Sequence, residues 1–118
     1  MHERPHEKLI AWREAYGLCL KVYKCTTRFP SHEQFALTNQ MRRAAYSVPL
    51  NIAEGNTKRS SKDKARFFEI ARGSLEELHC QCRIAHGLRY LDRAEFTAID
   101  DHLQRVSYLL HRLRSAIL

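Results

Sequence analysis

Six cations lie in one short stretch of the sequence and are its clearest candidates for chemistry. Only Asp63 and Glu69 interrupt them, so positive charge outweighs negative charge there. Clustered cations on one helix face are the electrostatic footprint of proteins that bind the phosphate backbone of nucleic acids. The alternative is an ordinary solvated helix face. The candidate nucleic-acid-binding residues are Lys58, Arg59, Lys62, Lys64, Arg66 and Arg72.

A second basic feature is the adjacent pair Arg42 and Arg43. The planar guanidinium group binds carboxylates through two parallel hydrogen bonds, which favours arginine at protein interfaces. Glu54 follows in the last turn of the same predicted helix, where an acidic side chain opposes the helix dipole. We expect its cationic partner on another helix or in another subunit, unless Glu54 is simply solvated. The candidate subunit-interface residues are Arg42, Arg43, Asn51 and Glu54.

A metal site is the less favoured interpretation of His79, Cys82 and His86. Their intervals of three and four place them on one helix face, where they could supply soft ligands. Cys82 also fits the pattern of a buried core residue, and no second ligand set accompanies the three. The cysteines lack paired CxxC spacing and lie in apolar helical stretches, which indicates reduced thiols. We expect no bound metal.

The sequence shows no recognised catalytic motif of three common kinds: a nucleophile elbow, a glycine-rich phosphate loop or an HExxH pair. Two acidic pairs occur, Glu76 with Glu77 and Asp100 with Asp101. Adjacent side chains on a helix diverge by about 100°, so neither pair converges on one substrate atom. We therefore expect a protein that is not an enzyme and needs no cofactor.

The composition indicates one helical domain over residues 1–118 with an anionic partner. The chain is 44% apolar and 28% charged, and its formal net charge of +7 favours nucleic acid or an acidic surface. Four glycines and three prolines allow few turns, which favours few, long elements over a β fold. No signal peptide or membrane span is recognised, so we expect a cytoplasmic protein that does not enter a membrane.

Apolar residues at steps of three and four predict four helices. The first carries Trp12, Tyr16 and Tyr23 as core or interface aromatics and ends near Phe29, because Pro30 disfavours helical geometry before it. The predicted seams of the third and fourth helices are Phe68, Ala71, Leu75, Leu78, Cys82 and Ala85, and then Phe96, Ile99, Leu103, Val106, Leu110, Leu113 and Ile117.

Capping signals predict where the later helices begin. The second opens at Ser31 with Gln34, the third at Ser60 with Asp63, and the fourth at Asp92 with Glu95. The second helix is expected to be kinked at Pro49, or broken there, and to end at Gly55 in a left-handed conformation. Short connections make neighbouring helices antiparallel. The expected fold is an all-α, up-and-down antiparallel four-helix bundle.

The segment RRAAYSVPLNIAEGN resembles a known bacterial family, the 23S rRNA intervening-sequence proteins. RFPSHEQFALTNQM precedes it and RSSKDKARFFEIARGSLEEL follows it, so the resemblance extends from about Leu9 to Leu91. The chain departs from the usual pattern at Tyr46 and around His79 to Cys82. The resemblance implies a four-helix bundle that assembles into a closed ring, typically a pentamer.

Two functions from different classes follow. The first is a nucleic-acid-binding accessory protein, for structured RNA or for DNA, in which a homo-oligomeric ring multiplies a modest basic patch. The second is a self-associating structural or protein-interaction module, in which the arginines pair with acidic residues between subunits. An accessory role beside a reverse transcriptase is a related alternative, by analogy of fold with basic helical rings that accompany retroelements.

Overall fold

Four long helices account for most of the chain. The computed structural model describes residues 1–117, and these contain helices and turns but no strand. Two short 3-10 helices, η1 (Pro5–Lys8) and η2 (Ser31–Glu33), precede the first and second long helices. The long helices are α1 (Ile10–Thr26), α2 (Leu37–Asn56), α3 (Ser61–Gly87) and α4 (Arg93–Ser115).

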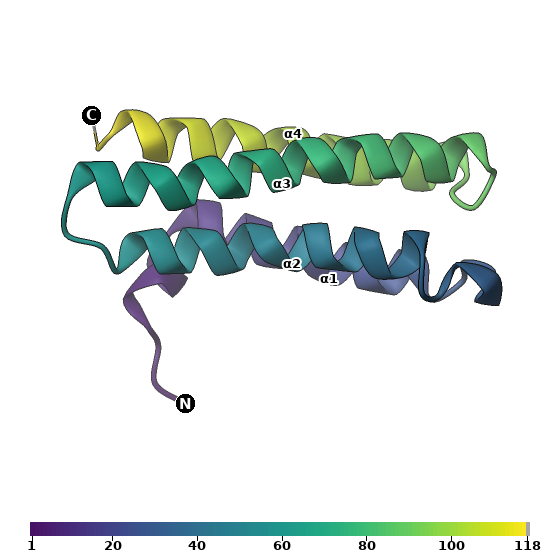
Figure 1. The fold of residues 1–118 in the computed structure, drawn as a ribbon, viewed down its shortest axis with the longest axis horizontal. Helices are drawn as coiled ribbons and strands as arrows, with labels where there is room; N and C mark the ends of the chain where they lie inside the picture. Colours follow the sequence, from purple (N-terminus) through teal and green to yellow (C-terminus); the bar gives the residue numbers. More distant parts are fainter. Residues whose placement is uncertain (118) are drawn as a thin grey trace.

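The helices form the expected up-and-down bundle (Figure 1). Each helix packs against the next along the chain, and α4 returns to pack against α1, which closes the bundle. The α2–α3 connection and the C-terminus therefore lie at one end, and the α1–α2 and α3–α4 connections lie at the other (Figure 1). The all-α four-helix bundle predicted from the sequence is confirmed.

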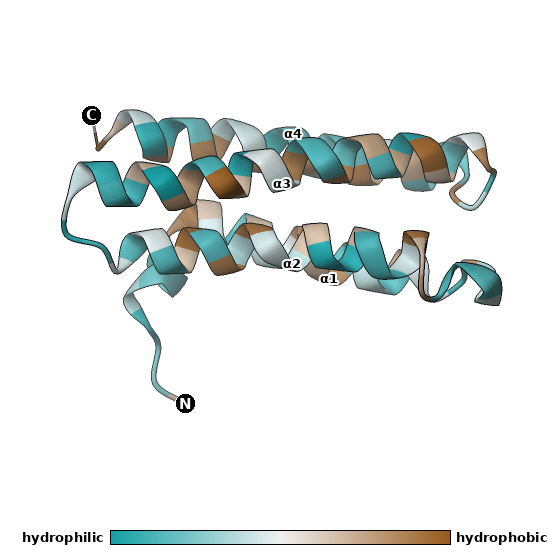
Figure 2. Ribbon diagram, viewed as in Figure 1, coloured by the Kyte–Doolittle hydropathy of each residue, from teal (hydrophilic) through white to brown (hydrophobic). Residues whose placement is uncertain are grey.

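One apolar core runs through the bundle, and many of its buried residues belong to the predicted seams of α3 and α4. All six predicted seam residues of α3 are buried, as are the central four of α4. Figure 2 shows apolar residues recurring along each helix, whereas the α2–α3 connection is hydrophilic. Among residues 1–117, no helix combines the length and apolar content that a membrane crossing requires.

The predicted core face of α1 is partly wrong. Tyr16 and Tyr23 are exposed and Trp12 is only partly buried, with its ring stacked on Tyr16 at a centroid distance of 5.2 Å. Ala11, Ala15, Leu18 and Val22 form the buried face of α1 instead. The core-facing stripe is therefore displaced by about one residue from the aromatic positions, which lie beside it.

The start of α2 was also predicted wrongly. Ser31 begins the 3-10 helix η2, and α2 starts six residues later at Leu37, with Ala36 at the N-cap and no side-chain cap. The carboxylate of Glu33 accepts a hydrogen bond from the Leu37 N–H at 3.3 Å and replaces the expected Ser31–Gln34 capping box. The helix then continues without interruption through Pro49, so the alternative of a break there is wrong.

Gly55 is the third correction. No glycine among the described residues has a positive φ, so Gly55 does not end α2 in a left-handed conformation. It is buried inside the last turn, where an added Cβ would lie 2.6 Å from Cε1 of Phe68. Glycine is needed here because α2 and α3 approach closely, and not because of backbone torsion.

Candidate nucleic-acid interface

The α2–α3 connection forms the basic end of the bundle. Lys58 and Arg59 lie in the turn after α2, and Ser60 starts α3 by accepting a hydrogen bond from the Asp63 N–H at 3.1 Å, as predicted. This cap fixes the direction of the first two turns of α3, which carry Lys62, Lys64 and Arg66, whereas Arg72 lies further along the helix. The α2–α3 connection and the start of α3 lie at one end of the bundle (Figure 1), so five of the six predicted cations share that end.

Three of the six predicted cations are available to a partner. Arg59, Lys62 and Arg66 are exposed, and none of them forms an ion pair with any of residues 1–117. Arg66 lies over the ring of Phe67, with its guanidinium carbon 4.9 Å from the ring centroid. This contact holds the guanidinium in place without neutralising its charge.

The other three predicted cations are already engaged. Lys58 pairs with Glu54 at 3.5 Å, and its Nζ also lies over the Phe67 ring, 5.1 Å from the centroid. Lys64 donates to the carbonyl of Asn56 at 3.2 Å and so binds the negative end of α2. Arg72 donates to Glu69 through its Nε at 2.9 Å. These contacts within the chain reduce the free charge that the sequence alone suggests.

Glu69 is held by two arginines. Arg72 binds one carboxylate oxygen, and Arg114 of α4 approaches the other at 2.7 Å. The hydrogen bond from Arg72 lowers the pKa of Glu69, so the carboxylate remains charged between them. Glu69 therefore neutralises part of the basic surface and ties the start of α3 to the end of α4.

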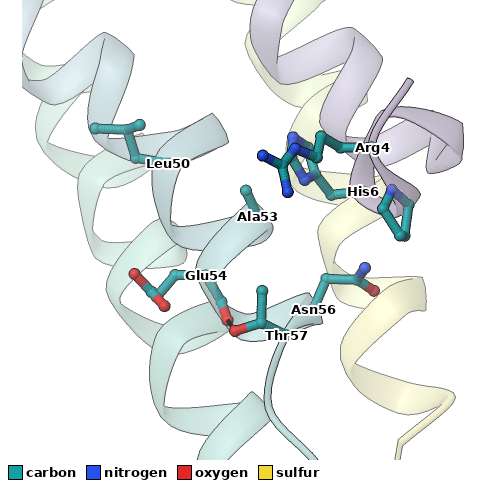
Figure 3. A pocket seen from close by; sticks show the side chains of 8 residues that line it. Arg4, His6, Leu50, Ala53, Glu54, Asn56 and Thr57 are labelled. Carbon is teal, nitrogen blue, oxygen red and sulfur yellow. Dashed lines mark hydrogen bonds between the residues drawn. The ribbon is translucent and has the colours of Figure 1, made fainter. Parts of the chain in front are cut away.

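The structure places a further cation, Arg4 of the N-terminal segment, near the C-terminal end of α2. Arg4 and His6 of the N-terminal segment face Ala53 of α2 across a pocket of about 390 Å³ (Figure 3). The same pocket is lined by Glu54 and by Thr57, whose hydroxyl donates to the Glu54 carbonyl at 2.6 Å. Sequence reasoning missed this juxtaposition because helical periodicity does not say how η1 and the residue before it pack against α2.

The predicted interface residue Arg42 is used inside the chain. Its Nε donates to the Thr26 hydroxyl at 2.8 Å and its Nη2 to the Tyr23 carbonyl at 3.3 Å. The guanidinium also lies over the Tyr23 ring, 4.8 Å from the centroid. Arg42 thus binds the C-terminal end of α1, where the helix dipole favours a cation.

Arg43 is placed differently from its neighbour. It is exposed, forms no ion pair with any of residues 1–117, and lines a depression between α2 and α3 together with Glu77. Beside it, Asn51 donates to the Ser47 carbonyl at 2.8 Å, and the Ser74 hydroxyl reaches that of Ser47 at 2.8 Å. Asn51 therefore belongs to a polar contact between α2 and α3.

The cationic partner of Glu54 is nearer in the sequence than expected. Its partner is Lys58, four residues further along the chain, and not a residue of another helix or subunit. Residues four apart lie side by side along a helix, and Thr57 keeps helical geometry just after α2. The two side chains therefore meet. The expectation of a cationic partner on another helix or in another subunit is not met within this chain. The assignment of Glu54 to a subunit interface stays a prediction.

The histidine and cysteine residues of α3 form separate contacts. Among the described residues, no group of three or more His, Cys, Asp or Glu side chains could hold a metal ion. His79 approaches Asp100 at 3.4 Å, whereas His86 bonds the Leu91 carbonyl at 3.1 Å. Cys82 is buried, and this burial raises its pKa to about 12. A thiol in this state is a core residue and not a nucleophile.

Comparisons with known proteins point to one family. A model of the 23S rRNA-intervening sequence protein family matches residues 7–112. A solved structure from Bacteroides thetaiotaomicron VPI-5482, a protein of unknown function from the S23 ribosomal protein family, has the same fold with a TM-score of 0.83. The similarity covers 90% of this chain and 96% of that one at 16% sequence identity. The comparison with curated proteins found no match.

Proposed function

Because the chain belongs to the 23S rRNA-intervening sequence protein family, we propose that it is a cytoplasmic, non-enzymatic accessory protein that binds structured RNA. It would do so as a homo-oligomer, through the basic end of each bundle. The observation that carries this proposal is the exposed group Arg59, Lys62 and Arg66, which has no ion pair within residues 1–117.

The arrangement of these cations favours the phosphate backbone over individual bases. Arg59 lies in the turn after α2 and Lys62 and Arg66 at the start of α3, where all three side chains are exposed and none lines a described pocket. Neutralising phosphates releases counterions, so affinity depends steeply on salt and little on sequence. Three free cations per chain give weak binding, and an oligomer that presents several copies raises the overall affinity.

The face of α2 and α3 supports self-association. The hydrogen bond between Ser47 and Ser74 sets the register of these antiparallel helices. One helical turn from that bond, Leu50 and Ile70 lie at the same level and remain 60% and 47% exposed. In the other direction along α2, Arg43 offers an unpaired guanidinium. Apolar side chains flanked by a free charge fit an interface between copies, and a pentameric ring is the assembly we expect.

The same face favours the competing function, a self-associating module without nucleic acid. Arg43 and Glu77 carry opposite charges in one depression but form no ion pair with each other in the described chain. Each could pair with its counterpart in another copy. Under this second function the charge of the basic end would be incidental, and removing it would leave the protein's partner binding unchanged.

The test is an RNA titration with nuclease-treated protein and two triple variants. Replacing Arg59, Lys62 and Arg66 with Glu should abolish binding to a labelled RNA hairpin while helicity and oligomer size stay the same. The control is the reversal of three exposed cations elsewhere, chosen for the same change in net charge: Lys24, Arg89 and Arg93. The control should keep most of the affinity, because its charges lie at the other end of the bundle.

Equal loss of binding in both triple variants would show that net charge alone attracts RNA. Parent affinity in the Arg59, Lys62 and Arg66 variant would favour the structural module. Unlabelled duplex DNA, added as a competitor, separates binding of structured RNA from binding of any polyanion.

Self-association has its own measurement. Light scattering during size exclusion, from micromolar to submillimolar protein, should give one mass well above that of the 13.9 kDa chain. Arg43→Glu should lower that mass, whereas Arg42→Gln should act mainly on stability, because Arg42 binds the end of α1. A monomer mass at every concentration would refute the assembly.

A further inference from the structure

A second pocket lies at the end of the bundle opposite to the basic end. It has a volume of about 340 Å³ and opens between the C-terminal end of α1, η2 and the first turn of α2. Apart from Phe29 and Pro30, every residue that lines it has a side-chain hydrogen-bond donor. These polar residues are Thr26, Thr27, Ser31, Gln34, Thr38 and Arg42.

Arg42 gives the pocket its charge, and no acidic residue lines it. Two of the five guanidinium N–H groups bind Thr26 and the Tyr23 carbonyl, so three remain to donate to a ligand. The contact with the Tyr23 ring fixes the plane of the guanidinium. The cation is thus held in place before any ligand arrives, which lowers the entropic cost of binding.

Thr38 is the observation that points to a ligand. The residue is only 7% exposed, and its hydroxyl has no hydrogen-bond partner among residues 1–117. That oxygen is not among the sealed, unpaired polar atoms of the described chain, so it opens onto the pocket that Thr38 lines. A buried hydroxyl without a partner costs free energy unless a bound group or water satisfies it.

The start of α2 adds a backbone donor at Thr38, which lines the pocket. Glu33 accepts the hydrogen bond of the Leu37 N–H, and its other oxygen accepts from the Tyr90 hydroxyl at 2.9 Å. The N–H groups of Thr38 and Asn39 have no acceptor among residues 1–117. Unpaired N–H groups at the positive end of a 20-residue helix favour an anion.

We propose that this pocket binds a phosphate group. A tetrahedral oxyanion accepts hydrogen bonds from several directions, and Arg42, the Ser31 and Thr38 hydroxyls and the Thr38 N–H are the donors that line this pocket. The hydroxyls of Thr26 and Thr27 are not among them, because they already donate to the Val22 and Lys24 carbonyls. A carboxylate is planar, and pairing both of its oxygens with Arg42 would leave the Ser31 and Thr38 hydroxyls without an acceptor. The proposal is independent of RNA binding at the basic end, because it uses none of those cations.

The test is a phosphorus NMR titration of inorganic phosphate with the full-length protein, at constant ionic strength set with chloride. Saturable binding is expected for the parent. Thr38→Val keeps the shape of the side chain and removes the hydroxyl, and it should weaken phosphate binding about tenfold or more. Arg42→Lys keeps the charge but removes the planar donor set, and it should weaken binding at least as much.

The matched control is Arg43→Lys, at the neighbouring arginine that lines the other depression. It should bind phosphate as the parent does. Thermal unfolding of each variant separates a loss of binding from a loss of folding, and Thr38→Val decides the result if Arg42→Lys does not fold. Binding that is absent in the parent, or equal in the parent and Thr38→Val, would overturn the proposal.

Two competitors identify the source of the phosphate. A short 5′-phosphorylated oligonucleotide carries a terminal monoester and backbone diesters, whereas its 5′-hydroxyl counterpart carries diesters alone. Displacement of inorganic phosphate by the phosphorylated form only assigns the pocket to a free or terminal phosphate. Equal displacement by both forms assigns it to the nucleic-acid backbone.

Discussion

Replacing Gly55 with alanine should destabilise the protein, although alanine is the better helix former. The added Cβ would lie 2.6 Å from Cε1 and 2.9 Å from Cδ1 of Phe68, and 3.2 Å from Cβ of Phe67. Phe68 is only 1% exposed, so its ring cannot move aside into solvent. Overpacking of this kind costs about 1 to 3 kcal/mol.

Gly73→Ala is the matched control, because an added Cβ there meets no atom within 4 Å. Alanine in an open helix position stabilises by about 1 kcal/mol relative to glycine. The two variants share most of this propensity gain, so the difference between them isolates the clash at Gly55. Urea unfolding at one fixed protein concentration should separate their free energies of unfolding by about 1 to 3 kcal/mol.

Gly55→Asn distinguishes close packing from a left-handed backbone. Asparagine tolerates a positive φ, so under a left-handed Gly55 it would be milder than alanine. Close packing gives the opposite order, because the larger side chain meets Phe68 more severely. A Gly55→Ala variant as stable as Gly73→Ala, or an asparagine variant more stable than alanine, would refute the packing argument.

Three further results are expected from the core and the caps. Cys80 is exposed and should react quickly with a thiol reagent, whereas buried Cys82, with its pKa raised to about 12, should react only after unfolding, as mass spectrometry over time can show. Burial lowers the pKa of His102 below its ordinary 6.5. As the pH falls, the imidazole is therefore protonated at a higher pH in the unfolded chain than in the folded one. The free energy of unfolding should therefore decline as pH drops below about 6.5, and urea titrations should show a flatter decline for His102→Gln. Asp92→Ala removes a capping box made with Glu95 and should cost about 1 kcal/mol in the same assay.

The sequence predicted α3 and α4 well because several local signals agree there. Ser60 and Asp92 both accept a hydrogen bond from the third residue of their helix, and the apolar seams lead directly into the core. In α1 the signals conflict, because large aromatic residues and small alanines repeat with the same period. Which face is buried depends on how closely α1 packs, and that distance is set by the other helices.

The sequence predicted where the candidate site lies but overestimated how many of its cations are unpaired. The sequence places six cations together, yet Lys64 binds the end of α2 and Arg72 shares Glu69 with Arg114 of α4. The Glu69–Arg72 pair lies three residues apart on one helix, so its spacing could have predicted it. The contacts of Lys64 with α2 and of Arg114 with Glu69 require the turn after α2 and the return of α4 to the same end of the bundle. Sequence spacing describes only neighbours on one helix, so contacts of this kind cannot be deduced from it.

The salt dependence of RNA binding tests the central claim most directly. The logarithm of the association constant for a labelled RNA hairpin should fall linearly with the logarithm of salt concentration, and removing one phosphate contact should make the slope shallower by up to about 0.9. Arg59→Gln, Lys62→Gln and Arg66→Gln should each reduce the slope in this way, whereas Arg89→Gln should leave it unchanged. Slopes equal to that of the parent in all three variants at the basic end would contradict the account.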